Sequence, residues 1–158
     1  MLNEFITFFA AALPLSELRG AIPLAILEFG FSPYKAFIIS ALGNILPVLP
    51  ILFFLGKASA YLSRKFYWFN RFFSWLFERT RTKHAEHFMC WKNLALFIFV
   101  AIPLPLTGAY SGAVAAFVFG FSPKHAFWSI ISGVLLAGVM VTIITVFGAV
   151  LFKRLFLL

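Results

Sequence analysis

The chain has 158 residues, of which 63% are hydrophobic and only 11% are charged, and its formal net charge is +8. Soluble globular domains carry about a quarter charged residues, so this composition excludes an ordinary soluble domain and predicts an all-α integral membrane protein, with a single membrane domain over residues 1–158. Because the basic residues lie beside aromatic clusters, we expect them to face anionic lipid headgroups and not nucleic acid.

The first 30 residues contain two short apolar arms. As helices, Phe5–Ser16 would be about 18 Å long and Gly20–Gly30 about 16 Å long, which is about half of the hydrocarbon thickness in each case. These lengths favour a re-entrant hairpin that reaches the bilayer centre and returns. The alternative is one kinked helix that crosses the membrane completely.

Between these arms, the stretch PLSELRG places Glu17 and Arg19 two positions apart in apolar sequence. Residues two apart do not face each other on a continuous helix, so they can approach only where Pro14, Gly20 and Pro23 break it. A charge at the bilayer centre costs about 2.5–3.5 kcal/mol on insertion scales, and such residues commonly mark a transport pathway.

The charged pair has two possible roles. Burial favours the protonated form of Glu17 whereas Arg19 favours its charged form, so this acid could load and release a proton. The guanidinium could hold an anion such as phosphate with paired donors. The alternative is a structural ion pair that fixes the hairpin.

The motif GFSP introduces two long apolar stretches, Ala36–Gly56 and Ala126–Phe152. Each stretch is long enough to cross a hydrocarbon core of about 30 Å. The serine can cap a helix and the proline suits its first position. We therefore predict a transmembrane helix after each GFSP.

The two halves of the chain resemble each other at an offset of 90 residues. Aligning Gly30–Gly43 with Gly120–Gly133 gives seven identities in 14 positions. This predicts two inverted repeats, each a re-entrant helical hairpin followed by a long transmembrane helix. The boundaries are repeat one at 1–62, an interfacial segment at 63–91 and repeat two at 92–158. Such duplication is typical of transporters. In the alternative in which the first arm of each copy crosses the membrane completely, the two copies would be parallel and not inverted.

Asn44 lies within the first predicted transmembrane helix, before Pro47 and Pro50. Both prolines remove backbone hydrogen bonds and predict a kink. The Asn44 side chain could reach a central cavity or bond the freed carbonyls.

Segment 63–91 combines apolar residues at helical spacing with tryptophans and basic residues. This pattern predicts an amphipathic helix in the headgroup layer, either a surface anchor or a gating element. By the positive-inside rule we expect this central loop to be cytoplasmic. His84, His87 and Cys90 lie at helical spacing but lack a fourth ligand, so we expect no metal.

In the second half, Pro103, Pro105 and Gly108 separate two further short arms, Asn93–Ile102 and Ala109–Gly120. These arms predict a second hairpin, with a break at its tip like that of the first. We expect both breaks to act as hinges.

The second predicted tip offers hydroxyl groups where the first offers charges. If the two tips meet, Thr107, Tyr110 and Ser111 would form the neutral wall of an asymmetric site, although the small residues near Ser111 could serve only helix packing. The candidate substrate- or proton-binding residues are Ser16, Glu17, Arg19, Asn44, Thr107, Tyr110 and Ser111. We expect a homodimer, because two hairpins and two helices are little material to enclose a pathway.

The motifs PLSELRGAIPLAI, GFSP and PLPLTGAYSG together resemble the putative small multi-drug export protein family, over nearly the whole chain. More distantly, the paired hairpins resemble the architecture of DedA-type (VTT-domain) membrane proteins. The family resemblance implies export of small, cationic or amphipathic compounds.

We therefore expect a proton-coupled secondary transporter in the cell (inner or plasma) membrane. The chain lacks paired catalytic carboxylates, Ser/His/Asp sets and phosphate loops, so we expect no enzymatic activity and no cofactor. One alternative is a translocase (flippase) for a lipid phosphate carrier, such as polyprenyl phosphate or a phospholipid. The other is a non-transporting membrane assembly factor.

Overall fold

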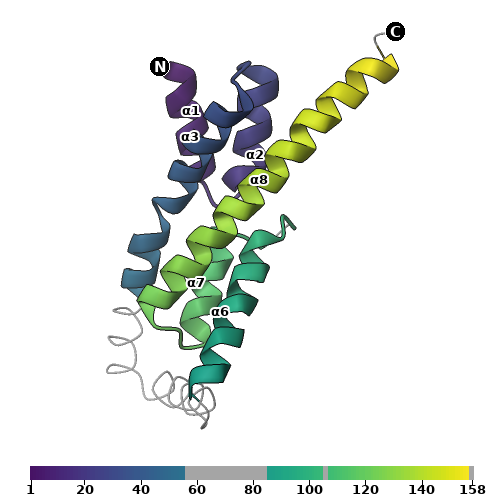
Figure 1. Cartoon of the computed structure of the whole chain (residues 1–158). Helices are drawn as coiled ribbons and strands as arrows, with labels where there is room; N and C mark the ends of the chain where they lie inside the picture. The colour runs from purple at the N-terminus through teal and green to yellow at the C-terminus, as the bar shows by residue number, and fades with distance from the viewer. Residues whose placement is uncertain (56–84, 105–106, 157–158) are drawn as a thin grey trace.

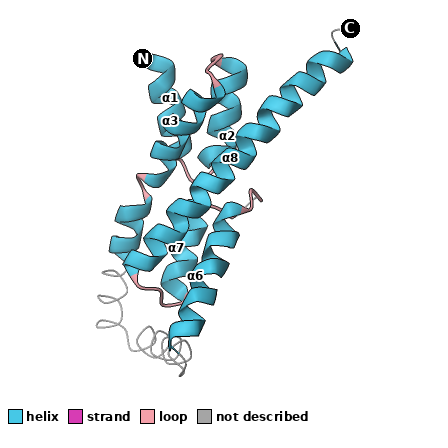
Figure 2. Cartoon of the chain, in the orientation of Figure 1, coloured by secondary structure: helices cyan, strands magenta, loops and turns pink. Residues whose placement is uncertain are grey.

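The structure, a computed structural model, describes residues 1–55, 85–104 and 107–156. Within these ranges the chain forms helices joined by turns and contains no strand, which confirms the all-α class (Figure 2). The helices are α1 (Leu2–Ala12), α2 (Glu17–Pro23), the π-helical η1 (Leu24–Glu28), α3 (Pro33–Ile45), α6 (Ala85–Ala101), α7 (Ala109–Val118) and α8 (Pro123–Phe156).

Two stretches are long and apolar enough to cross a membrane, Pro33–Leu55 and Pro123–Leu155. They confirm the two long helices predicted after GFSP, and both begin at the proline, the first helical position that the sequence predicts. The amphipathic helix predicted over 63–91 falls mostly on residues 56–84, outside the described part of the chain. Its last residues instead begin α6, which starts at Ala85 and not at Asn93.

The two GFSP motifs differ in how their serines act. Ser32 caps α3, because its hydroxyl oxygen accepts a hydrogen bond from the Lys35 amide at 3.4 Å. Before α8, the Ser122 hydroxyl lies 2.6 Å from Nδ1 of His125. The serine cap was thus predicted correctly for α3, whereas Ser122 bonds a side chain.

A left-handed glycine begins each GFSP motif, with φ of 64° at Gly30 and 66° at Gly120. Glycine adopts this conformation without the steric cost that a Cβ would add. Each glycine therefore reverses the chain after a short helix and directs it into a long one.

The first long stretch is interrupted near its centre. α3 ends at Ile45, and helix resumes over residues 48–55 after a short turn. Pro47 lies in this turn and has no N–H to offer the carbonyl of Gly43, four residues earlier. The expected kink is at this turn, while Pro50 lies inside the helical segment 48–55.

The shorter helices form two hairpins that lie against the long helices (Figure 1). α1 and α2 pack against each other and against α3, and α2 also contacts α8; α6 and α7 pack against each other and against α8. In Figure 1 the two hairpins open toward opposite ends of the molecule. The described parts of their connecting segments, 13–16 in the first hairpin and 102–104 with 107–108 in the second, therefore come together near its middle.

Each long helix approaches the first arm of its neighbouring hairpin at a glycine. A Cβ on Gly43 of α3 would overlap the carbonyl oxygen of Phe8 in α1. A Cβ on Gly133 of α8 would lie 2.9 Å from the carbonyl oxygen of Phe97 in α6. These two glycines match at the offset of 90 residues, and both allow close backbone packing between helices.

The buried core lies where α2, α6, α7 and α8 meet, and large apolar side chains cover the outside. Fully buried core residues include Leu18, Ile22, Val100, Ile130 and Val134. Exposed large apolar residues include Phe9, Trp128, Phe147 and Leu151. Apolar side chains on both the inside and the outside are typical of a helical protein that is solvated by lipid.

Candidate functional site

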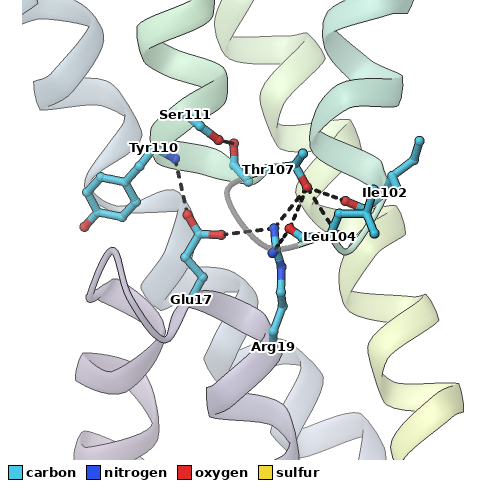
Figure 3. Close-up of polar contacts among 8 residues, drawn as sticks. Glu17, Arg19, Ile102, Leu104, Thr107, Tyr110 and Ser111 are labelled. Carbon is cyan, nitrogen blue, oxygen red and sulfur yellow. Dashed lines mark hydrogen bonds and ion pairs between the residues drawn. The ribbon is translucent and has the colours of Figure 1, made fainter.

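The tips of the two hairpins meet, and polar side chains from each tip reach the other (Figure 3). Glu17 and Arg19 come from the start of α2. Thr107, Tyr110 and Ser111 come from the end of the second connection and the start of α7. The structure therefore brings together the charged and hydroxyl-bearing groups that the sequence places about 90 residues apart.

Glu17 is a buried carboxylate with weak partners. The residue is 8% exposed. Its Oε1 accepts a hydrogen bond from the Tyr110 amide at 3.5 Å, and its Oε2 lies 3.8 Å from Nη2 of Arg19. Both distances are at the long limit for such interactions, so the carboxylate is far from saturated.

The backbone of Glu17 is strained. Its φ is 47°, the one positive value among the described non-glycine residues. A left-handed conformation costs a residue with a Cβ roughly 1–2 kcal/mol. Strained backbone of this kind is concentrated at functional sites, where the surrounding structure holds it in place.

Arg19 binds the second hairpin more closely than it binds Glu17. Its Nη1 donates to the carbonyl of Leu104, and its Nη2 donates to Oγ1 of Thr107 at 3.3 Å. Leu104 lies three residues beyond the end of α6, and its carbonyl also accepts a hydrogen bond from the Thr107 amide at 3.1 Å. The guanidinium therefore joins the two hairpins.

Thr107 fixes the shape of the second connection. Its Oγ1 lies 2.7 Å from the carbonyl oxygen of Ile102 and 2.8 Å from that of Leu104. The Leu104 amide also donates to this Oγ1, at 3.2 Å. The acceptors for Arg19 are thus held in place by a local network.

Tyr110 makes a second link between the hairpins. Its hydroxyl donates to the carbonyl of Ala12, the last residue of α1. Its amide faces Glu17, as described above. Ser111, one residue on, donates to the carbonyl of Gly108 within its own hairpin at 3.4 Å.

A cavity of about 600 Å³ lies between the tips. Its lining includes one acid and one base, and its other polar groups are neutral. The lining residues are Pro14, Leu15, Ser16, Glu17, Arg19, Gly20, Pro103, Thr107, Tyr110 and Ser111.

Asn44 is the predicted site residue that the structure keeps apart from this cavity. It is only 1% exposed, lies in α3, and does not line the cavity. Its Oδ1 has no hydrogen-bond partner within the described residues. The structure therefore does not place Asn44 in the cavity, and the alternative role, in which its amide N–H groups bond freed carbonyls, stays a prediction.

The predicted hinges fall into two groups. Pro14 lies in the first connection, and Pro103 and Gly108 lie in the second. Gly20 and Pro23 lie within α2, so they do not interrupt it as expected; the α-helix becomes π-helical only after Pro23. Of the other predicted breaks, Pro47 lies in the turn after α3, Pro50 lies within helix, and Pro105 lies outside the described residues.

Backbone groups are the main part of the site that sequence reasoning missed. The carbonyls of Ala12 and Leu104 accept the two links between the hairpins. The one available signal was their position near the ends of predicted arms, where carbonyls lack helical partners. Among the described residues, no group of three or more His, Cys, Asp or Glu side chains is placed to hold a metal ion.

Comparison with protein families assigns the chain to a family. The family model described as "putative small multi-drug export protein" matches residues 17–140. The chain belongs to this family. The match begins at Glu17 and includes the second tip and most of the residues that line the cavity, whereas Pro14, Leu15 and Ser16 lie before it. This member of the export family is a membrane protein. No curated protein and no solved structure matches the chain.

Proposed function

We propose that this member of the export family is a secondary transporter that exports small organic cations in exchange for protons. Its cavity between the tips is the transport site. The observation that carries this proposal is the buried, weakly partnered carboxylate of Glu17 in that cavity.

The proposal includes an arrangement in the membrane. Helices of 11 residues (α1) and 10 residues (α7) are about 16 Å and 15 Å long, roughly half of the hydrocarbon thickness. We infer that the hairpins are re-entrant and belong to two inverted repeats, with their tips at the bilayer centre. Irregular backbone at that depth is tolerated where it lines a cavity.

Glu17 supports coupling between proton and cargo. A buried carboxylate without strong donors needs a positive charge, and either a bound proton or a cationic ligand supplies it. Because both would compete for the same two oxygens, release of one would favour binding of the other. This competition would make transport depend on a pH gradient.

Arg19 supports a cationic rather than an anionic cargo. Its guanidinium already donates to Leu104 and Thr107 in the second hairpin. An anion such as a lipid phosphate would have to compete with these two acceptors. A cation could bind the part of the Glu17 carboxylate that lines the cavity without displacing either of these hydrogen bonds.

We further propose that two copies form a homodimer in the cell membrane, with residues 56–84 in the cytoplasm. Leu15 at the first tip is fully exposed beside the cavity. A second copy at the same depth in the bilayer would cover this side. The basic residues of 56–84 support the cytoplasmic assignment.

The proposal is tested by flux into sealed proteoliposomes. Purified protein is reconstituted, a pH gradient is imposed, and uptake of ethidium, a fluorescent organic cation, is followed. Glu17→Gln keeps the size of the side chain but removes its charge, so we expect gradient-driven uptake to fall at least about tenfold, a loss in the range that a single proton-transfer group contributes.

The matched control is Glu28→Gln, which removes an exposed carboxylate at the end of η1, outside the cavity. It should leave uptake unchanged. Thermal unfolding in detergent verifies that both variants are folded. Equal uptake by wild type and a folded Glu17→Gln variant would refute the role of this carboxylate.

A further inference from the structure

The two tips can be aligned on their Pro-Leu-Ser and Pro-Leu-Thr motifs, at an offset one residue greater than that of the GFSP motifs. PLS begins at Pro14 and PLT begins at Pro105, so the tips match at an offset of 91 residues. The resulting pairs are Ser16 with Thr107, Glu17 with Gly108, and Arg19 with Tyr110.

The carboxylate of Glu17 lies against its own counterpart. A Cβ on Gly108 would lie 2.6 Å from Cδ and 2.7 Å from Oε1 of Glu17, and it would overlap Oε2. Contacts this short are not tolerated, so even a methyl group at residue 108 would displace the carboxylate. The space that a side chain of the second tip would occupy is filled by the acid of the first.

The links between the hairpins are reciprocal. Arg19 of the first hairpin donates to the carbonyl of Leu104, near the end of α6. Tyr110, its counterpart in the second hairpin, donates to the carbonyl of Ala12, at the end of α1. Each tip therefore uses the same position to hold the end of the other hairpin's first helix.

We propose that the cavity is one site built from two matching half-sites, and that Gly108 is a positioning residue that seats Glu17. The absence of a side chain at Gly108 limits the site to a single carboxylate. It also holds that carboxylate within reach of the Tyr110 amide and Arg19. The flux readouts below rest on the proposed function, whereas the stability readout does not.

The first test is a double-mutant cycle of thermal stability in detergent. Gly108→Ala should lower the Tm of wild type by roughly 2–4 °C, because the added methyl displaces the flexible end of Glu17 from its partners. The same change should cost less than about 1 °C in a Glu17→Gly background, where the carboxylate is absent. Glycine also suits the left-handed backbone at residue 17, so this background should fold.

Gly148→Ala is the matched control, because a Cβ there would meet no atom within 4 Å. Because it lies inside α8, where alanine is favoured over glycine, it should raise the Tm slightly and by the same amount in both backgrounds. An equal loss for Gly108→Ala in the two backgrounds, or no loss in either, would overturn the seating of Glu17 at Gly108.

The second test uses ethidium flux. It asks whether Gly108 sets the position of the Glu17 carboxylate or only leaves space for it. Gly108→Ala should shift the pH of half-maximal uptake by about one unit, because it moves the carboxylate away from its partners. An unchanged pH profile would overturn the positioning role.

The third test exchanges the two tips by combining Glu17→Gly, Arg19→Tyr, Gly108→Glu and Tyr110→Arg. If the half-sites are equivalent, the exchanged protein folds and retains flux, although Glu17→Gly alone has none. An exchanged protein that is unfolded or inactive would overturn their equivalence. If wild type itself shows no flux, the proposed function fails, but the stability cycle still decides the inference about Gly108.

Discussion

The two hairpin tips have similar sequences and meet in the same cavity, yet they differ in chemistry. The first tip contributes the charged side chains of Glu17 and Arg19, whereas the second contributes hydroxyls, an amide and carbonyls. The neutral groups surround the charged ones and supply their hydrogen-bond partners. Two charged side chains in apolar surroundings can thus obtain most of their hydrogen bonds from neutral groups of a distant segment and not from each other.

The largest effect that this comparison predicts is at Arg19. Arg19→Met removes two donors to the second hairpin and leaves Glu17 without a nearby positive charge. We expect the free energy of unfolding to fall by about 2–4 kcal/mol. Reversible denaturation in mixed detergent micelles measures this change.

Arg19→Lys is the control for charge alone, because lysine keeps the positive charge but lacks the planar fork that reaches two acceptors. It should recover only part of the lost stability. If Arg19→Met were as stable as wild type, the guanidinium would not hold the tips together.

A smaller effect is predicted at Tyr110, the neutral counterpart of Arg19. Tyr110→Phe removes one neutral hydrogen bond, to Ala12, and keeps the ring and the amide that faces Glu17. The free energy of unfolding should fall by about 0.5–1.5 kcal/mol, and ethidium flux should persist. If the free energy of unfolding fell as much as in Arg19→Met, the charged link and the neutral link would be energetically equal, which would contradict the expected difference between the two tips.

Local patterns in the sequence predicted much of the fold. Apolar length identified the two long helices, and the GFSP motif placed their starts to within a few residues. The proline at residue 47 indicated the interruption after α3. These features depend on residues close together in the chain, so one stretch of sequence is enough to predict them.

The contacts of the site could not be predicted in the same way. The sequence indicated that Glu17 and Arg19 could pair, and they lie 3.8 Å apart, but it did not indicate that the guanidinium also reaches Leu104 and Thr107, 85 and 88 residues away. Such contacts depend on how two distant turns meet, and their acceptors include a backbone carbonyl that side-chain patterns do not reveal. Asn44 shows the same limit, because its polarity in an apolar helix suggested a place in the cavity that it does not have.

A transport site between two half-crossing hairpins requires Glu17 and Arg19 to lie deep in the bilayer. A density map of the protein in lipid nanodiscs would place Glu17 and Arg19 relative to both headgroup layers. Our account predicts that they lie near the middle of the hydrocarbon layer, about 15 Å from either of its surfaces. A map that places the pair at the level of the headgroups, in contact with bulk water, would contradict a transport site between two half-crossing hairpins.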